Sequence, residues 1–191
     1  REIAERELID TMVRHQASHD MLNGLPNRVL FHDRLHVAIQ RANRHHGRFA
    51  LACIDIDGFK HVNDTHGHAA GDALLQEIAA RLPLQLRAND TVARLGGDEF
   101  ALILEDIDDP QLALQLCQKL CATLGEPYTL CIGGSAVEVS IGASIGIAPD
   151  LPHEHPDADE QLIHAADHAM YHAKKSTRNS VTVAPLKPKA Q

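Results

Sequence analysis

One stretch of the chain, residues 49–56, limits the fold more than any other. Its sequence, FALACIDI, is a short and almost continuous apolar run that ends in carboxylates. A run of this length is typical of a strand buried on both faces in the middle of a sheet. Because Asp55 and Asp57 follow the apolar positions directly, we expect both at the carboxyl end of a central strand.

The remaining segments alternate between helical and strand patterns. Apolar residues at helical spacing predict helices after residue 28 and over residues 70–87, 110–124 and 158–176. Period-two patterns and turn residues predict strands over residues 91–95, 100–104, 136–148 and 181–184. From residue 49 the order is strand, helix, strand, strand, helix, strand. This order predicts an α+β, ferredoxin-like fold in which helices pack on one side of an antiparallel sheet.

The turn between two of these strands is the second constraint. Residues 96–99 are Gly-Gly-Asp-Glu, which predicts a hairpin turn. If the central strand ends beside this turn, Asp55 and Asp57 meet Asp98 and Glu99. Oxygen ligands without Cys or His favour Mg²⁺ over Zn²⁺, and carboxylates so crowded repel one another without a cation. Each acid taken alone is more simply a solvated or capping residue, so only the joint pattern indicates a metal site.

Size and charge restrict the classes of function. A chain of 191 residues is long enough for one catalytic domain with its own core. The net charge of -8, the 3% aromatic content and the absence of Trp disfavour extended nucleic-acid binding. We therefore expect no nucleic-acid partner, and any phosphate ligand requires local Lys or Arg and metal ions.

The chain divides into three parts in this interpretation. Residues 1–18 have helical spacing and are predicted to form a stalk, residues 19–184 the domain, and residues 185–191 a Lys/Pro tail. No apolar stretch approaches the roughly 20 residues of a membrane span, and no signal segment is visible. We expect a cytoplasmic domain, whether or not the full-length protein is anchored in a membrane.

The cysteines and histidines do not indicate metal ligands. The four cysteines lack the paired spacing of a zinc site and are predicted to be reduced, mostly buried thiols. His164, His168 and His172 repeat every four residues, which is more typical of a solvated helix face than of a ligand set.

The sequence resembles the GGDEF family of diguanylate cyclases. The signature is present as residues 96–100, GGDEF, and residues 20–28, DMLNGLPNR, are similar to the family's D-x-L-T-G-L-x-N-R. Residues 55–72 (DIDGFKHVNDTHGHAAGD), 139–148 and 166–179 (ADHAMYHAKKSTRN) extend the resemblance from about residue 19 to residue 183. The visible departure is Asn23, where Thr is usual. The resemblance implies a palm-type nucleotidyl cyclase fold, with a central, mostly antiparallel sheet surrounded by helices.

The resemblance also implies a catalytic centre. Asp55 and Asp98 match the side-chain ligands of Mg²⁺, for which Mn²⁺ can substitute, and the Ile56 carbonyl matches a third ligand. Glu99 would lie beside them. Asp98 matches the proposed proton acceptor for the 3'-hydroxyl, although strand alternation leaves open whether Asp98 or Glu99 faces the metal.

The same resemblance implies the substrate contacts. The backbone amides of Phe59 and Lys60 would face the phosphates of GTP, and Lys174 and Arg178 would supply positive charge. Three further residues match contacts to the nucleotide: Asn63 and Asp72 at the guanine edge, and His68. From the residues alone, helix capping is the preferred explanation of Asn63 and Asp72.

The implied reaction joins two GTP molecules into cyclic di-GMP and releases pyrophosphate, with one GTP per subunit of a homodimer. Arg87 and Asp90 resemble the R-x-x-D site at which the product inhibits many diguanylate cyclases. A local ion pair is the alternative, and the position just ahead of the signature favours the inhibitory site. A sensory domain upstream and a phosphodiesterase domain downstream are the expected partners in the full-length protein. The alternatives are a silent GTP- or cyclic di-GMP-binding module and a palm-like polymerising domain.

Overall fold

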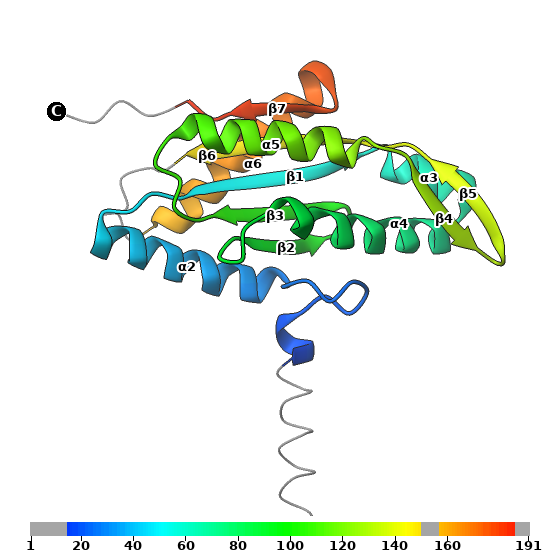
Figure 1. Ribbon diagram of the computed structural model, residues 1–191, viewed down its shortest axis with the longest axis horizontal. Coiled ribbons are helices and arrows are strands. Elements are labelled where there is room, and N and C mark those ends of the chain that lie inside the picture. Colours follow the sequence, from blue (N-terminus) through cyan, green and yellow to red (C-terminus); the bar gives the residue numbers. More distant parts are fainter. Residues whose placement is uncertain (1–14, 150–156, 186–191) are drawn as a thin grey trace, which may run out of the picture.

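The computed structural model describes residues 15–149 and 157–185, and a five-stranded sheet forms its centre (Figure 1). The strands lie in the order β2-β3-β1-β6-β7. Their bounds are β1 Ala50–Asp57, β2 Thr91–Gly96, β3 Glu99–Leu104, β6 Gly142–Pro149 and β7 Ser180–Val183. Neighbouring strands are antiparallel except for β6 and β7, which are parallel. The predicted mostly antiparallel sheet, with the strand after residue 49 at its centre, is confirmed.

Helices cover both faces of this sheet (Figure 1). They are α2 Arg28–His45, α3 Phe59–His66, α4 His68–Arg81, α5 Pro110–Leu124 and α6 Ala158–Thr177. Alternate residues of β1 enter two separate cores, since Ile54 packs among residues of α4 and α5 while Leu51 and Cys53 pack among residues of α2 and α6. The expectation of helices on one side only is therefore wrong, and that of a sheet surrounded by helices is confirmed.

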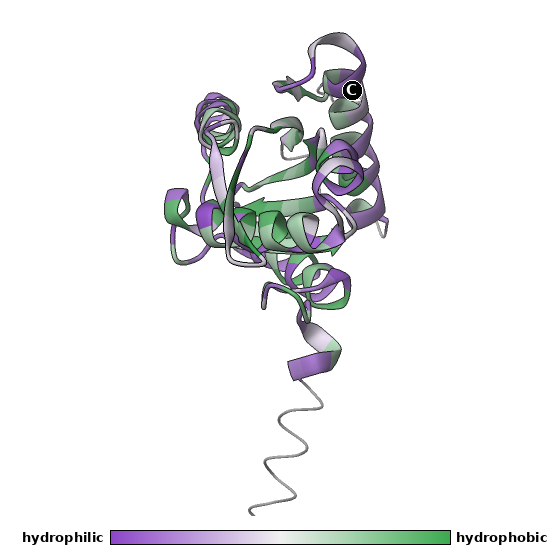
Figure 2. Ribbon diagram, turned by 90° about the vertical axis from the view of Figure 1, so that its right-hand side faces the viewer, coloured by the Kyte–Doolittle hydropathy of each residue, from purple (hydrophilic) through white to green (hydrophobic). Residues whose placement is uncertain are grey.

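Hydropathy follows this layered arrangement. In Figure 2 the strands at the centre are mainly green, and the helices around them carry purple stretches that face outward. Gly146 of β6 allows α6 to lie directly on the sheet, because a Cβ atom there would be 2.7 Å from the Cα of Met170 and closer still to backbone atoms of α6. The close contact fixes α6, which carries Lys174 and leads directly into Arg178.

Two predicted elements differ from the observed ones. The long strand over residues 136–148 is broken, because β5 (Ser135–Val139) pairs with β4 (Tyr128–Ile132) in a separate hairpin while β6 pairs with β1. The helix predicted over residues 70–87 begins two residues earlier and ends at Arg81, where a 3₁₀ turn over Leu82–Gln85 accommodates Pro83. The eight-residue helix α3 was not predicted.

Other predictions stand as made. The hairpin β2-β3, α5, α6 and β7 lie within two residues of their predicted bounds. The cysteines are free thiols, three of them buried and Cys131 exposed. His164, His168 and His172 are all exposed on α6, as expected of a solvated face. Most of the predicted stalk and of the predicted tail lies outside the described residues, and the division into three parts remains a prediction. Within residues 15–149 and 157–185, no helix has the length and apolarity that crossing a bilayer requires.

Candidate active site

A cavity of about 460 Å³ opens beyond the carboxyl end of β1. Its walls come from the end of β1, the start of α3, the β2-β3 turn and the last part of α6. The predicted site residues among its lining are Ile56, Phe59, Lys60, Asp98, Lys174 and Arg178. The fold thus brings together segments that are more than a hundred residues apart in the sequence.

The two acidic segments meet beside this cavity, as the sequence predicts. Asp55 of β1 lies opposite Glu99 of β3 in the antiparallel register, so their side chains share one face of the sheet. The amide of Ile56 donates to the Asp98 carbonyl at 3.2 Å, which ties the end of β1 to the turn. Of the two acids that the sequence left open, Asp98 lines the cavity, while Glu99 lies beside Asp55.

The environment of these acids disfavours their charged forms. Burial raises the pKa of Asp55, and the negative charges of Asp98 and Asp57 raise it further, while Lys174 opposes the rise. Burial also raises the pKa of Glu99, with a further contribution from Asp55. The site therefore concentrates carboxylates that a nearby cation would stabilise in their ionised state.

Lys174 is the cation that Asp55 contacts in this structure. Its Nζ donates to both carboxylate oxygens at 2.8 Å. Burial alone would lower the pKa of Lys174, but the hydrogen bond and the charge of Asp55 outweigh it and raise that pKa. Lys174 and Arg178, predicted to share a helix face, do line the same cavity.

The donor set fits a hard divalent cation. Every group offered is an oxygen, from Asp55, Asp98, Glu99 and the Ile56 carbonyl, and oxygen ligands suit Mg²⁺ or Mn²⁺. In the described part of the chain, no three His, Cys, Asp or Glu side chains converge on one point. A cation here would therefore rely on a backbone oxygen and on substrate or water oxygens, which is common for Mg²⁺.

Asp57, which the sequence placed in the same acidic group, has a different environment. Its carboxylate accepts hydrogen bonds from Ser144 Oγ at 2.9 and 3.1 Å and from the amide of Asn179 at 2.8 Å. Asp57 is thus held by a strand hydroxyl and a backbone amide, whereas Asp55 is held by the side chain of Lys174, so the two carboxylates have different partners. Asp57 also lines the cavity with Asp98, so its grouping with the other acids remains a prediction.

The residues predicted to contact the base lie on α3 and α4. Asn63 is half-buried inside α3, His68 is the exposed first residue of α4, and Asp72 is exposed one turn later. Neither helix has a side-chain cap, so the capping alternative for Asn63 and Asp72 is not supported. Asn63 packs against the backbone at Gly71, where a Cβ atom would lie 2.9 Å from its Cγ and closer to its Oδ1. The absence of a side chain at Gly71 thus leaves the space that the Asn63 amide occupies.

Arg94 ties the turn at Asp20 to the β2-β3 turn. Arg94 Nη1 contacts both carboxylate oxygens of Asp20 at 3.0 and 3.1 Å, and its Nε and Nη2 donate to the Gly97 carbonyl at 3.0 and 2.8 Å. The Arg94 side chain is only 12% exposed. Asp20 belongs to the turn that follows the helical residues 15–18, so the position of that turn and that of the residue before Asp98 are linked.

The predicted inhibitory residues lie at the opposite end of β2. Asp90 accepts from the amides of Arg87 at 2.9 Å and Glu105 at 3.0 Å, and Arg87 and Asp90 line a cavity of about 280 Å³. Within the described residues no ion pair joins the Arg87 guanidinium to Asp90, so the local ion-pair explanation is not supported. Strand β2, which separates them from the β2-β3 turn, spans about 20 Å.

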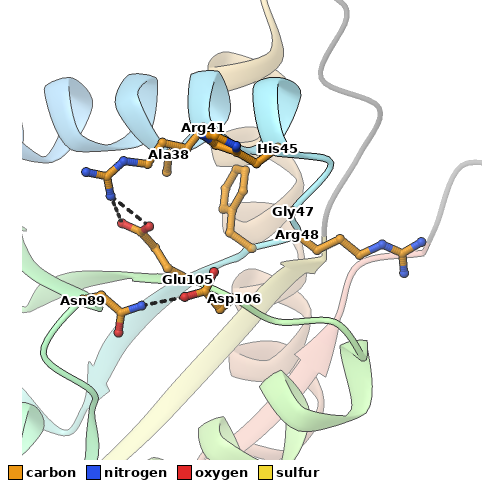
Figure 3. A pocket seen from close by; sticks show the side chains of 10 residues that line it. Ala38, Arg41, His45, Gly47, Arg48, Asn89, Glu105 and Asp106 are labelled. Atoms are coloured by element: carbon orange, nitrogen blue, oxygen red, sulfur yellow. Dashed lines mark hydrogen bonds and ion pairs between the residues drawn. The ribbon is translucent and has the colours of Figure 1, made fainter.

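A second cavity, of about 350 Å³, adjoins this region (Figure 3). Arg41 of α2 reaches across it to Glu105, with contacts of 3.2 and 3.4 Å, and Asn89 donates to Asp106 at 2.9 Å. Glu105 lines both cavities, so they lie side by side.

Comparison with known proteins identifies the family. A family model described as the GGDEF domain of diguanylate cyclases matches residues 17–180. The chain belongs to the GGDEF family of diguanylate cyclases. The fold class and the resemblance drawn from the sequence are therefore confirmed.

Relatives in this GGDEF family are similar over most of the chain. The bifunctional diguanylate cyclase/cyclic di-GMP phosphodiesterase MucR of Pseudomonas aeruginosa is 49% identical over 92% of the chain, which spans 24% of MucR. The diguanylate cyclase TpbB of the same organism is 46% identical over 90% of the chain, which spans 38% of TpbB. The chain therefore corresponds to well under half of each relative.

Solved GGDEF structures share its architecture. The GGDEF domain of Pseudomonas aeruginosa TpbB matches with a TM-score of 0.80 at 46% identity, covering 88% of this chain and 95% of that one. The coiled coil and GGDEF domain of DgcB from Caulobacter crescentus, solved in complex with c-di-GMP, matches with a TM-score of 0.86 at 29% identity. That match covers 96% of this chain and 94% of the DgcB chain.

Several residues of the site had no role assigned from the sequence. They are Asp20, Gly71, Arg94, Ser144 and Asn179. Four of them, all except Arg94, stand inside the family-like motifs, so the motif spans were the available signal. The contacts between Arg94 and Asp20, and those of Ser144 and Asn179 with Asp57, join residues far apart in the sequence, so only the fold reveals them.

Proposed function

We propose that this chain condenses two GTP molecules into one cyclic di-GMP and two pyrophosphates. The observation that carries the proposal is the cavity where Asp98 and the end of β1 face Lys174 and Arg178, in a chain of the GGDEF family. Acidic and basic residues around one opening suit a nucleoside triphosphate bound with a divalent cation.

The chemistry is nucleotidyl transfer. The 3'-oxygen of one GTP attacks the α-phosphorus of the other, and the bond from that phosphorus to the pyrophosphate oxygen breaks. Asp98 accepts the 3'-hydroxyl proton, since it lines the cavity and lies beside β1. Asp55, the Ile56 carbonyl and Asp98, with Glu99 alongside, would hold Mg²⁺ or Mn²⁺. When bound, such a cation offsets the negative charge that develops on the phosphate and on the attacking oxygen.

Basic residues and backbone amides hold the triphosphate. Lys174 reaches the cavity from the last turn of α6 and Arg178 from the position just after that helix. The amides of Phe59 and Lys60 lie in the first turn of α3, where helix amides are unpaired. On binding of substrate and cation, Lys174 would exchange its contact with Asp55 for one with a phosphate oxygen. The exchange leaves Asp55 free to act as a ligand.

Guanine recognition falls to α3 and α4. A carboxylate at Asp72 can accept from the N1–H and the exocyclic amine of guanine, while the Asn63 amide can serve another polar edge atom, with His68 as a further contact. Adenine lacks this pair of donors. The proposed substrate is therefore GTP rather than ATP.

The proposed assembly is a homodimer. One cavity holds one GTP, and two reacting GTP molecules must face each other, so two domains meet with their substrates antiparallel. A phosphodiesterase domain downstream is proposed for the full-length protein, since MucR's name combines cyclase and phosphodiesterase activities. A sensory domain upstream is proposed because one solved GGDEF structure is described as a sensory box/GGDEF family protein. Product inhibition is proposed at Arg87 and Asp90, remote from the catalytic turn.

A silent regulatory module is the alternative. It would bind GTP or cyclic di-GMP without turnover, and the presence of all the proposed catalytic residues disfavours it. Incubating purified protein with GTP and Mg²⁺ and identifying the products by mass spectrometry separates the two functions. Cyclic di-GMP and pyrophosphate support the cyclase, whereas bound but unchanged GTP supports the silent module.

A further inference from the structure

The junction between α6 and β7 has an unusual backbone. After Arg178 ends the helix, Asn179 adopts a left-handed conformation with φ of 58°. Asn is one of the few residues other than Gly that enters this region readily. The chain therefore turns sharply at Asn179, and this turn sets where Arg178 points.

Hydrogen bonds from three other elements converge on this turn. The amide of Asn179 donates to Asp57 Oδ2 at 2.8 Å, and its Oδ1 accepts from the amide of Ala143 at 3.2 Å and from Cys121 Sγ at 3.4 Å. Asp57 in turn accepts from Ser144 Oγ. Asp57 is 8% exposed and Ser144 is 0% exposed, so the network is buried where it meets the sheet.

Space at this junction is also reserved for Asn179. A Cβ atom at Gly142 would lie 3.0 Å from Asn179 Cβ and 3.2 Å from its Oδ1. Any larger residue at that position would press on the turn. The strand β6 is thus shaped to seat the residue that follows Arg178.

We propose that Asp57, Ser144 and Asn179 form a clamp that positions Arg178 on the triphosphate of the bound nucleotide. The inference rests on the proposed function, since it assigns Arg178 to GTP. Arg178 is exposed and lines the cavity, while the residue after it is fixed to β1 and β6. A long, exposed side chain binds phosphate tightly only if its backbone is held in place. Asp57 is thus a positioning residue, not a metal ligand.

A double-mutant cycle on nucleotide affinity tests the clamp. The α,β-methylene analogue of GTP, which cannot be cyclised, is titrated with Mg²⁺ into wild type, Asp57→Ala, Arg178→Ala and the double variant. Each single change is expected to weaken binding about 10-fold, typical of losing a supporting hydrogen-bond partner. The double variant is expected to bind within about 2-fold of Arg178→Ala, because Asp57 acts through Arg178. If the fold-losses in affinity of the two single variants multiplied in the double variant, the clamp would be overturned. It would also be overturned if excess Mg²⁺ restored the affinity that Asp57→Ala loses.

Milder variants keep the test valid if Asp57→Ala does not fold. Asn179→Gly keeps the left-handed backbone and the amide donor but loses the side-chain bond to Ala143, and Ser144→Ala removes one donor to Asp57. Each is expected to raise the dissociation constant, and to do so only when Arg178 is present. Glu160→Ala, an exposed change at the start of α6, is the control and should bind as wild type does.

The wild-type titration distinguishes a failure of the proposed function from a failure of the clamp. If wild type fails to bind the GTP analogue, the proposed function fails. If wild type binds and the changes at Asp57, Ser144 and Asn179 show no coupling to Arg178, the clamp alone fails.

Discussion

Replacing Gly71 with Ala tests whether Asn63 contacts the guanine base. The added Cβ atom would lie 2.9 Å from Asn63 Cγ and 3.2 Å from Phe59 Cζ. Carbon atoms in ordinary contact are about 3.5–4.0 Å apart, so the Asn63 amide must retreat by roughly 1 Å. The atoms in the way belong to the terminal amide of the half-buried Asn63 side chain, which can rotate away without moving helix α3.

The effects on stability and on binding then have different sizes. Ala in place of Gly inside α4 contributes about 1 kcal/mol through helix propensity, and an off-rotamer Asn63 costs about 0.5–1.5 kcal/mol. These nearly cancel, so Tm should change by no more than about 3 °C in a domain of this size. A misplacement of about 1 Å at a substrate contact can cost up to about 100-fold, and we expect GTP affinity to fall at least 10-fold.

Calorimetry with the α,β-methylene GTP analogue, alongside thermal unfolding, gives both numbers. Gly47→Ala is the matched control, since a Cβ atom there meets no heavy atom within 4 Å. It should leave both affinity and Tm unchanged. A folded Gly71→Ala protein that binds the analogue as tightly as wild type would show that Asn63 does not contact the nucleotide.

Three further outcomes are expected. Cyclic di-GMP should inhibit turnover without competing with GTP, and Arg87→Ala should relieve the inhibition while the initial rate stays unchanged; an identical inhibition curve in the variant would exclude Arg87. Activity per molecule should fall on dilution from micromolar to nanomolar protein, because two GTP-loaded domains must meet; a constant value would mean either a very tight dimer or catalysis within one chain. Burial raises the pKa of the Cys53 and Cys117 thiols to about 12, so at about pH 8 only the exposed Cys131 should react rapidly with a disulfide reagent; a fast thiol remaining in Cys131→Ser would contradict this.

Much of the fold could be predicted because its strongest patterns are local. The run before Asp55 identified a buried strand, and the glycines before Asp98 identified the hairpin that meets it. Local patterns gave wrong strand bounds where the pairing between strands, rather than the local sequence, determines where a strand begins and ends. Residues 136–148 look like one strand, but the chain changes partner from β4 to β1 within them. Helix α3 has Val62 as its single buried residue, so it shows little periodicity and depends on packing against α4.

The sequence predicted which acidic residues gather at the site, but not which partner each of them contacts. Asp55 and Asp57 are two residues apart and share a face of β1, so the sequence cannot tell that Asp55 contacts Lys174 while Asp57 contacts Ser144 and Asn179. Ser144 and Asn179, the partners of Asp57, lie 87 and 122 residues further along the chain. The contact of Arg94 with Asp20 could not be predicted for the same reason, since 74 residues separate the two.

The most direct test of the central proposal compares cyclic di-GMP formation by wild type, Asp55→Asn and Asp98→Asn. Each protein is incubated at high concentration with GTP and Mg²⁺, the products are separated and weighed by mass spectrometry, and circular dichroism checks the fold. Wild type is expected to yield one cyclic di-GMP for every two pyrophosphates. Both variants are expected to stay folded with turnover reduced at least 100-fold. Each loses a carboxylate that would hold the divalent cation, and charge stabilisation by such a cation is worth several kcal/mol in the transition state. Absence of cyclic di-GMP from the wild type, or near-normal turnover by either variant, would contradict the account.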